Sequence, residues 1–219
     1  PSKDQSYVLW GVTQECLSRT MFPIGEYEKS YIKQMARDMG LHDLANKSES
    51  YEICFIPDND YRAFLKTRVP ELEQQLEGGY FVDKTGKKLG QHRGYPFYTI
   101  GQRKGLEVAV GSALYVTEIR PETNTVVLGE LEDLEQQEML VRNINLIKYD
   151  NIHSPIETLT KIRYKDPGTM STIQQIGNSV KVTFHAPVKA VAPGQSAVFY
   201  EGDDVVGGGF IEKGPEDNN

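Results

Sequence analysis

The apolar residues in the first third of the chain recur three to four positions apart, which is the spacing of an amphipathic helix. The first stripe runs from Leu9 to Leu17 and ends near Pro23, and Asp4 stands where it can cap the helix or contact a partner. Cys16 belongs to this stripe, so the pattern predicts a core role for Cys16.

Two further helices are predicted before residue 70. One spans residues 27–39 and stops at Gly40, because glycine adopts the left-handed geometry that closes a helix. The other begins after Asp58 or Asn59 and ends before Pro70, because proline disfavours helical geometry in the preceding residue. Between them, the apolar run 52–56 predicts a short strand.

From Gly78 onward, short β segments alternate with turn sequences such as 83–86 and 121–124. Pro193-Gly194 fits the centre of a type II turn, and the glycines at 207–209 predict a bulge or tight corner. The expected strands are 115–119, 125–128, 157–164, 179–184, 197–200 and 205–211. This spacing is typical of an all-β barrel or sandwich.

The pattern therefore predicts an α+β chain that is mainly β. We expect an N-terminal helical segment over 1–50, a small β-rich central domain over 51–119 and a C-terminal antiparallel β-barrel over 120–219. The composition agrees with a globular protein, since 38% of the residues are hydrophobic and 25% are charged. No run is long and apolar enough for a membrane span and no signal peptide is evident, so we expect a cytoplasmic protein.

Charge is unevenly distributed along the chain. Lysine and arginine number 24 against 31 acidic residues, a net charge of -7, whereas a general binder of polyanions is usually basic. Residues 84–105 nevertheless contain six basic residues and no acidic one, and residues 122–138 contain six acidic residues and no basic one. The basic run is equally typical of a phosphate-binding face and of a solvated loop.

Three places carry candidate chemistry. In 99–106, two glycines flank Arg103 and Lys104, which suit contacts with phosphate oxygens but also an exposed turn. Arg163 and Tyr164 combine a phosphate donor with an aromatic face, which is suggestive of RNA binding but also ordinary for an exposed strand. Cys54 is either a small buried apolar residue or a reactive thiol. The two cysteines are too few for a disulfide framework and lack the clustered spacing of a zinc site, so no metal is expected.

Several motifs, in order along nearly the whole chain, together resemble the tRNA-specific 2-thiouridylases. They are Lys3-Asp-Gln-Ser-Tyr7, Phe22-Pro-Ile-Gly25, Ile53-Cys-Phe-Ile56, Gly90-x-His-x-Gly94, Thr99-Ile-Gly-Gln-Arg-Lys-Gly-Leu106 and Pro193-Gly-Gln-Ser-Ala-Val-Phe-Tyr200. Enzymes of this family replace the C2 oxygen of the wobble uridine of tRNA with sulfur. They use ATP to activate that carbon and a protein persulfide to deliver the sulfur.

The resemblance implies roles for particular residues. Cys54 matches the cysteine that carries the persulfide. The tRNA contacts of the family fall on Lys3, Asp4, Gln5, Arg163, Tyr164 and Gln195, and Arg103 and Lys104 are possible RNA-facing residues. The resemblance also implies that the terminal barrel is similar to those of translation elongation factors.

The sequence lacks other parts of the family pattern. We find no phosphate loop of an ATP-pyrophosphatase domain, no matching acidic residue and no second cysteine in the resolving position, and the first methionine is Met21. The chain therefore resembles a central and C-terminal portion, expected to be inactive alone and to bind no cofactor, with ATP and Mg²⁺ held by an N-terminal domain. The implied partners are the anticodon region of tRNA and a sulfur-donor protein, not DNA or a membrane.

Two alternative functions remain open from the sequence. A non-catalytic tRNA-binding module needs Arg163, Tyr164 and Gln195 but not Cys54. A docking module for a sulfur-relay protein would instead depend on the acidic segment 122–138.

Overall fold

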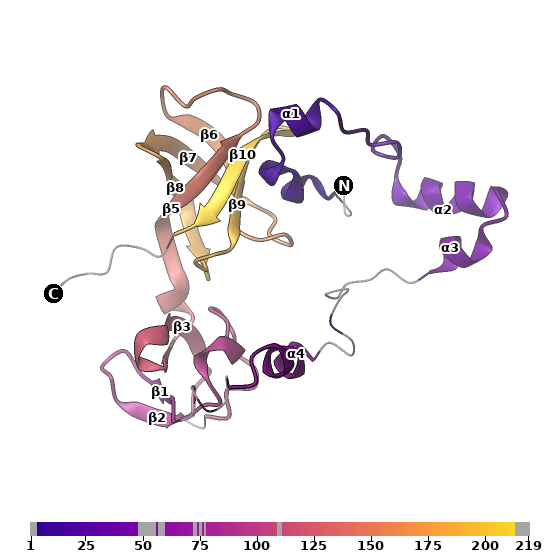
Figure 1. Cartoon of the computed structure of the whole chain (residues 1–219). Coiled ribbons are helices and arrows are strands. Elements are labelled where there is room, and N and C mark those ends of the chain that lie inside the picture. Colours follow the sequence, from indigo (N-terminus) through magenta and orange to yellow (C-terminus); the bar gives the residue numbers. More distant parts are fainter. Residues whose placement is uncertain are drawn as a thin grey trace. The chain divides into compact units, whose positions relative to one another are not determined.

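The computed structural model describes residues 4–47, 56, 60–71, 74, 76, 78–108 and 111–212 of the chain. Two compact units are present. One consists of Pro1–Gln5 and Gln14–Pro70, and the other of Ser6–Thr13 and Glu71–Asn219. The described part of the first unit contains only helices, and the second contains the strands (Figure 1). Of the strand predicted at 52–56, only Ile56 is among the described residues.

The helical unit contains α1 (Gln14–Leu17), α2 (Lys29–Asp38), α3 (His42–Asn46) and α4 (Tyr61–Arg68). Helix α2 confirms the prediction for 27–39, and Gly40 ends it with a φ of +77°. The Leu41 amide then donates to the carbonyl of Ala36 at 2.8 Å, which is a Schellman-type closure. The short helix α3 was not predicted.

Helix α4 ends before Pro70, as predicted, but its cap differs from the prediction. The cap is Asp60, whose carboxylate accepts a hydrogen bond from the amide of Ala63 at 2.9 Å. The predicted caps Asp58 and Asn59 lie outside the described residues. An aspartate directly before the first turn reaches the exposed amides of that turn, so Asp60 serves as the cap.

The prediction that Cys16 is a core residue is wrong. The stripe that contains it is divided between the 3₁₀ helix η1 (Ser6–Gly11) and the four-residue helix α1, and Cys16 is exposed. The two helical pieces are separated at residues 12–13, so the apolar positions before and after the break do not share one continuous helical face.

The second unit contains η1, a four-stranded sheet and a barrel. The strands of the sheet, β1 (Tyr80–Val82), β2 (Lys88–Gln91), β3 (Tyr115–Arg120) and β4 (Thr125–Gly129), lie in the order β2-β1-β4-β3. Strands β1 and β4 run parallel, and the other pairs are antiparallel. Short 3₁₀ helices occur at η3 (Tyr95–Phe97), η4 (Pro121–Thr123) and η5 (Glu132–Leu134). The sequence predicts that the barrel starts at residue 120. In the structure, strand β4 still belongs to the sheet, and the barrel starts with β5 at Glu135.

The predicted turns of this sheet are present. At 83–86, the Asp83 carboxylate accepts hydrogen bonds from the amides of Thr85 and Lys87 at 2.9 and 3.0 Å. At 121–124, Asn124 adopts left-handed geometry, with φ of 46°, and joins β3 to β4. The Asn124 side chain also donates to the carbonyl of Leu76 at 2.7 Å.

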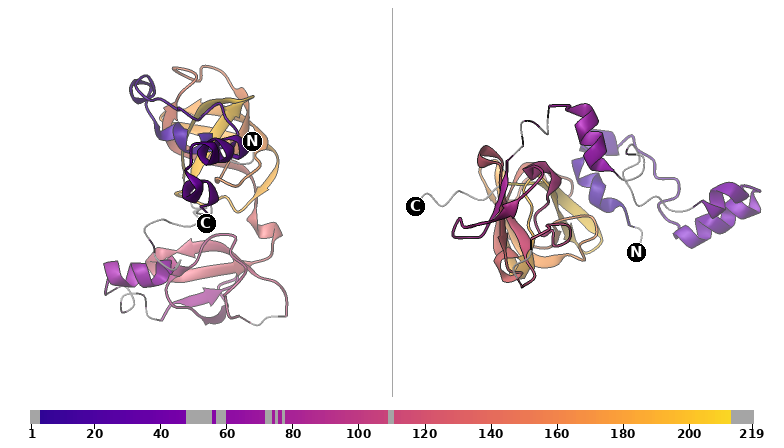
Figure 2. Two further views of the ribbon diagram at one scale, coloured as in Figure 1. Left: turned by 90° about the vertical axis from the view of Figure 1, so that its right-hand side faces the viewer. Right: turned by 90° about the horizontal axis from the view of Figure 1, so that it is seen from below.

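The remaining strands form a closed barrel in the order β10-β5-β8-β7-β6-β9, with antiparallel neighbours throughout (Figures 1 and 2). They are β5 (Glu135–Leu146), β6 (Ile156–Lys161), β7 (Thr169–Ile176), β8 (Ser179–Lys189), β9 (Ser196–Glu201) and β10 (Asp204–Ile211). This confirms the mainly β fold with a barrel. The strand predicted at 157–164 ends at Lys161, so Arg163 and Tyr164 lie in the loop between β6 and β7.

Two glycine-dependent features of the barrel confirm the predictions. The Gln195 amide donates to the carbonyl of Ala192 at 3.2 Å and Gly194 has a φ of +84°, the geometry of a type II turn. The pairing of β10 shifts register on both sides of Gly208, which is a bulged corner. None of the helices in the described ranges is long and apolar enough to cross a membrane.

Candidate functional site

The 3₁₀ helix η1 is anchored on the barrel at β10 and β5. Trp10 is buried against Val198 and Tyr200, and its ring meets that of Phe210 edge-on with centroids 5.2 Å apart. A Cβ atom at Gly208 would lie 2.9 Å from Trp10 Cγ, so glycine is needed for this close approach. The Asn145 side chain donates to the carbonyls of Trp10 and Val12 at 2.5 and 3.0 Å. These contacts fix η1 from several sides.

Tyr7, near the start of η1, contacts two separate segments of the barrel. Its hydroxyl donates to the carbonyl of Ser196 at 2.7 Å, at the beginning of β9. Its ring meets that of Tyr164 edge-to-face, with centroids 6.0 Å apart and planes at 69°. Burial raises the pKa of Tyr7 to about 12, so the hydroxyl stays a neutral donor at physiological pH.

These contacts connect the segments where the family resemblance places tRNA contacts. Gln195 is exposed and directly precedes Ser196, and Arg163 is exposed beside Tyr164. Tyr164 itself is 45% exposed, so part of its ring is available to a partner. Asp4 and Gln5 are also exposed and directly precede η1 in the chain. Lys3 and Cys54 lie outside the described residues.

The loop between β6 and β7 is ordered by its own hydrogen bonds. The Asp166 carboxylate accepts from the amides of Ile162 and Gly168 at 3.0 and 3.1 Å, and the Asp166 amide donates to the carbonyl of Arg163 at 3.0 Å. Gly168 has a φ of +92° and sits tightly against Leu159. The backbone that carries Arg163 and Tyr164 is therefore set before any partner binds.

A further cation lies next to this region. Lys161, at the end of β6, places its ammonium group over the Tyr200 ring, 5.0 Å from the centroid. The Tyr200 hydroxyl lies 3.2 Å from the Ser6 hydroxyl, within hydrogen-bond distance. We call Tyr7, Lys161, Arg163, Tyr164, Gln195 and Tyr200 the barrel cluster. It combines the exposed ring of Tyr164 with positive charge and polar groups, the combination that suits single-stranded or looped RNA.

Arg103 and Lys104 lie in the central sheet region, not in the barrel cluster. Their loop is tied down by Gln102, whose side chain accepts from the Thr99 amide at 3.1 Å and donates to the Lys104 carbonyl at 2.9 Å. Both cations are exposed, and no described residue forms an ion pair with either. They therefore remain a possible RNA-facing pair.

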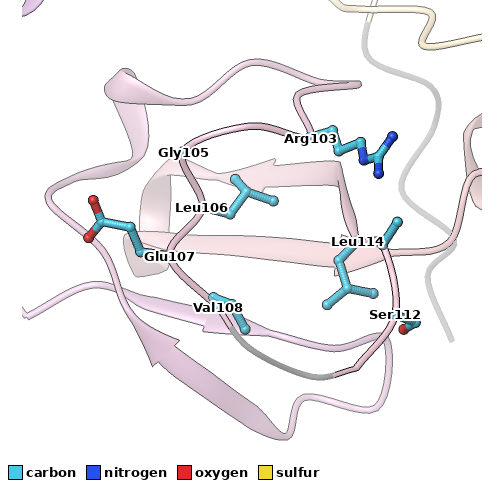
Figure 3. A pocket seen from close by; sticks show the side chains of 8 residues that line it. Arg103, Gly105, Leu106, Glu107, Val108, Ser112 and Leu114 are labelled. Atoms are coloured by element: carbon cyan, nitrogen blue, oxygen red, sulfur yellow. The ribbon is translucent and has the colours of Figure 1, made fainter.

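A pocket of about 380 Å³ lies beside this loop (Figure 3). Leu106 and Leu114 point into it, whereas Glu107 points away. Among the described residues that line the pocket, Leu106 and Leu114 face inward and no acid, base and nucleophile are arranged together, so we assign it no catalytic role.

Ion pairs within the chain neutralise part of both charged segments. Lys84 of the basic run pairs with Asp133 at 2.6 Å, and Arg93 with Glu107 at 3.5 Å. In the acidic segment, Glu135 and Glu138 pair with lysines of β8 at 3.1 and 2.8 Å. Hydrogen bonding to Lys84 lowers the pKa of Asp133. The acidic segment is therefore less available to a basic partner than its composition suggests.

The histidine of the Gly90-x-His-x-Gly94 motif is buried. His92 is 7% exposed and packs against the rings of Phe81 and Tyr98. Its Nδ1 accepts from the Gly94 amide at 3.0 Å, and no described residue forms a hydrogen bond with its Nε2. Burial lowers the pKa of His92. This histidine is a core residue of the central sheet and is not exposed to a substrate.

Comparisons with known proteins match three successive parts of the chain to family models. A tRNA methyl transferase HUP domain matches residues 1–58, a tRNA methyl transferase PRC-barrel domain matches 62–130, and an aminomethyltransferase beta-barrel domain matches 136–211. The last two ranges correspond to the four-stranded sheet and the closed barrel.

The chain is also similar over most of its length to curated proteins named tRNA-specific 2-thiouridylase MnmA. It is 56% identical to that of Cytophaga hutchinsonii, 53% to that of Amoebophilus asiaticus and 50% to that of Salinibacter ruber. These matches cover 96%, 96% and 97% of this chain. The chain belongs to the tRNA-specific 2-thiouridylase family. It spans 58%, 56% and 56% of the length of these three relatives.

Sequence patterns did not single out Tyr7 or Lys161 in this chain. Tyr7 is the last residue of the Lys3–Tyr7 motif, which is the one signal that pointed toward it. Its contact with Ser196 spans 189 positions of the chain, so only the folded structure reveals it. Lys161 carried no sequence signal, because an isolated lysine at a strand end is ordinary.

Proposed function

We propose that this chain supplies the sulfur-carrying cysteine and much of the tRNA-binding surface of an enzyme that thiolates C2 of the wobble uridine of tRNA. Membership of the 2-thiouridylase family supports the reaction. The single structural observation that supports the tRNA surface is the barrel cluster, in which Tyr7 connects Arg163–Tyr164 with the turn that carries Gln195.

In the proposed reaction, Cys54 carries the sulfur as a persulfide. The terminal sulfur attacks C2 of a uridine whose O2 has been adenylated, and O2 leaves with AMP. A second thiol of the enzyme then attacks Sγ of Cys54, so that the S–S bond breaks, a disulfide forms at Cys54 and 2-thiouridine is released. A persulfide sulfur is a good nucleophile because it is ionised near neutral pH, and it is already attached to the protein. The sulfur reaches the persulfide from an upstream donor protein.

This chain's own share of the reaction is sulfur delivery and tRNA binding. Across the described ranges, no three His, Cys, Asp or Glu side chains are grouped so that they could hold a metal ion. The sequence contains no phosphate loop of an ATP-pyrophosphatase domain, so we derive no step through Mg²⁺–ATP from these residues. We expect residues 1–219 alone to be inactive in thiolation.

The two cysteines of the chain provide a matched test. In the protein expressed from its complete gene, Cys54→Ser should abolish formation of 2-thiouridine, measured by mass spectrometry of digested tRNA, and leave tRNA binding intact. Cys16→Ser changes the exposed cysteine of α1 and should retain thiolation. Full thiolation by the Cys54→Ser protein would refute the role of Cys54.

The second candidate function is that of a non-catalytic tRNA-binding module. The barrel cluster favours it, because this cluster can bind RNA without Cys54. A chain with a net charge of -7 gains little from bulk attraction to RNA, so residues 1–219 alone should bind tRNA weakly at physiological salt. A salt-titrated binding assay measures this. Tight binding by residues 1–219, together with full thiolation by the Cys54→Ser protein, would favour the module.

A further inference from the structure

Tyr7 links η1 to two segments of the barrel that Trp10 and Asn145 do not connect. The anchoring of η1 on the barrel comes from Trp10, which packs at Gly208, and from the two hydrogen bonds of Asn145. Tyr7 also packs against the cluster of Trp10, Val198 and Tyr200. In addition, its hydroxyl reaches Ser196 at the start of β9, and its ring reaches Tyr164 in the loop between β6 and β7.

The two contacts of Tyr7 differ in kind and can be separated. The hydroxyl contact is a directional hydrogen bond to a backbone carbonyl, and it fixes the start of β9 next to Gln195. The ring contact is an edge-to-face packing that limits the rotation of the Tyr164 side chain. Removing the hydroxyl alone changes the first contact and leaves the second in place.

We propose that Tyr7 is a positioning residue for tRNA. It holds the Gln195 turn and the Arg163–Tyr164 loop in one arrangement, so that one stretch of RNA meets both without rearranging them. Binding is tighter when the contacting groups are ordered beforehand, because less conformational entropy is lost on association. This inference rests on the proposed function, in which those residues contact tRNA.

The test uses two variants of Tyr7 in the protein expressed from its complete gene. Tyr7→Phe removes only the hydrogen bond to Ser196, and Tyr7→Ala removes the ring contact as well. Tyr149→Phe is the matched control, because it removes another tyrosine hydroxyl of the barrel, one that donates to Glu201 at 2.7 Å. The measurements are the Kd for an unmodified tRNA transcript, the KM and kcat of thiolation, and the melting temperature.

A net hydrogen bond corresponds to about 3- to 10-fold in affinity, so Tyr7→Phe should raise the Kd for tRNA by about that factor. Tyr7→Ala should raise it further, by more than about 10-fold, because it also loses the ring contact. Both variants should raise KM and leave kcat nearly unchanged, and Tyr149→Phe should leave the Kd within about 2-fold. A Kd for Tyr7→Phe equal to that of the unaltered protein would overturn the proposal.

A double-mutant cycle separates positioning from general stability. Combining Tyr7→Ala with Gln195→Ala should raise the Kd less than the product of the single effects, because Gln195 contributes less once its turn is no longer held. Strictly multiplicative effects, or a loss of affinity that vanishes after correction for the unfolded fraction, would overturn the positioning role. Failure of the unaltered protein to bind or thiolate tRNA would instead count against the proposed function.

Discussion

The barrel and the central sheet are both built from short strands, but they bury polar groups in different ways. In the barrel, the buried hydroxyls of Thr158, Thr160 and Ser171 lie across β6 and β7 and hydrogen-bond to one another at 2.7–3.3 Å. The central sheet buries His92, whose Nε2 has no hydrogen-bond partner among the described residues. The barrel thus has a neutral, internally satisfied interior, whereas the sheet has an ionisable side chain in its core.

This difference implies different sensitivities. The closed barrel gives every strand two neighbours and encloses a continuous apolar core, so its stability depends mainly on packing. The four-stranded sheet is open and its strand β1 has only three residues, so single contacts around His92 and Asn124 carry more weight. Four experiments test this contrast.

The largest effect is expected in the barrel core. Phe199 is fully buried, so Phe199→Ala should lower the free energy of unfolding by about 3–5 kcal/mol, from the lost burial and the cavity left behind. Urea denaturation followed by circular dichroism measures this. Ile176→Ala, at a side chain that is 51% exposed on β7, is the control and should cost about 1 kcal/mol or less. Equal costs for the two variants would contradict the packing argument.

A smaller effect is expected where the sheet packs around His92. A methyl group at Gly79 would collide with the His92 ring and lie 2.8 Å from the Asn124 side chain, so Gly79→Ala should cost about 1–3 kcal/mol. The control is Gly90→Ala in β2, where the nearest atom would be 3.6 Å away. Differential scanning calorimetry should show a lower melting temperature for Gly79→Ala than for Gly90→Ala. The reverse order would be inconsistent with this packing.

The sheet should also lose stability in mild acid. Burial lowers the folded-state pKa of His92 from the ordinary 6.5, so the unfolded chain takes up a proton that the folded sheet excludes. The stability of the sheet should therefore decrease as the pH falls below about 6.5. Hydrogen exchange at pH 7.5 and 5.5, corrected for intrinsic rates, should show loss of protection in β1 and β4 but not in β8.

His92→Gln should remove this pH dependence, and His153→Gln, at an exposed histidine, should retain it. If protection in β1 and β4 were the same at both pH values, His92 would not be linked to the stability of the sheet.

The smallest effect is expected on the barrel surface. Lys148 donates to both Glu201 and Asp204. The hydrogen bond from Lys148 lowers the pKa of Glu201, and the hydrogen bond from the Tyr149 hydroxyl lowers it further. A lowered carboxyl pKa stabilises the fold above the unfolded value of about 4.5, and this contribution disappears as the pH falls through the folded-state pKa. Lys148→Met should therefore lower the urea midpoint slightly at pH 6, and this difference should shrink as the pH falls below about 4.5. A difference that does not shrink as the pH falls would point to lost packing rather than lost charge.

The sequence pattern predicted some helices correctly and others wrongly. The prediction for α2 succeeded because its apolar stripe and Gly40 stop are local signals within one element. The prediction of one stripe through Cys16 failed, since the chain breaks after Gly11 and η1 is held by contacts with β10 and β5 that lie far away in the sequence. Strands β5 and β7 were not predicted, because their exposed faces are rich in charged and polar residues that mask the alternation.

The sequence alone determined the family to which the chain belongs, the mainly β architecture, and turns such as Pro193-Gly194, because motifs and turn chemistry depend on neighbouring residues. The tertiary structure decided which distant segments meet. It placed Tyr7 against Tyr164 and Ser196, enclosed His92 between Phe81 and Tyr98, and paired the acidic segment with lysines. Such contacts depend on barrel closure and strand register, which result from the packing of the whole chain and which no local pattern encodes.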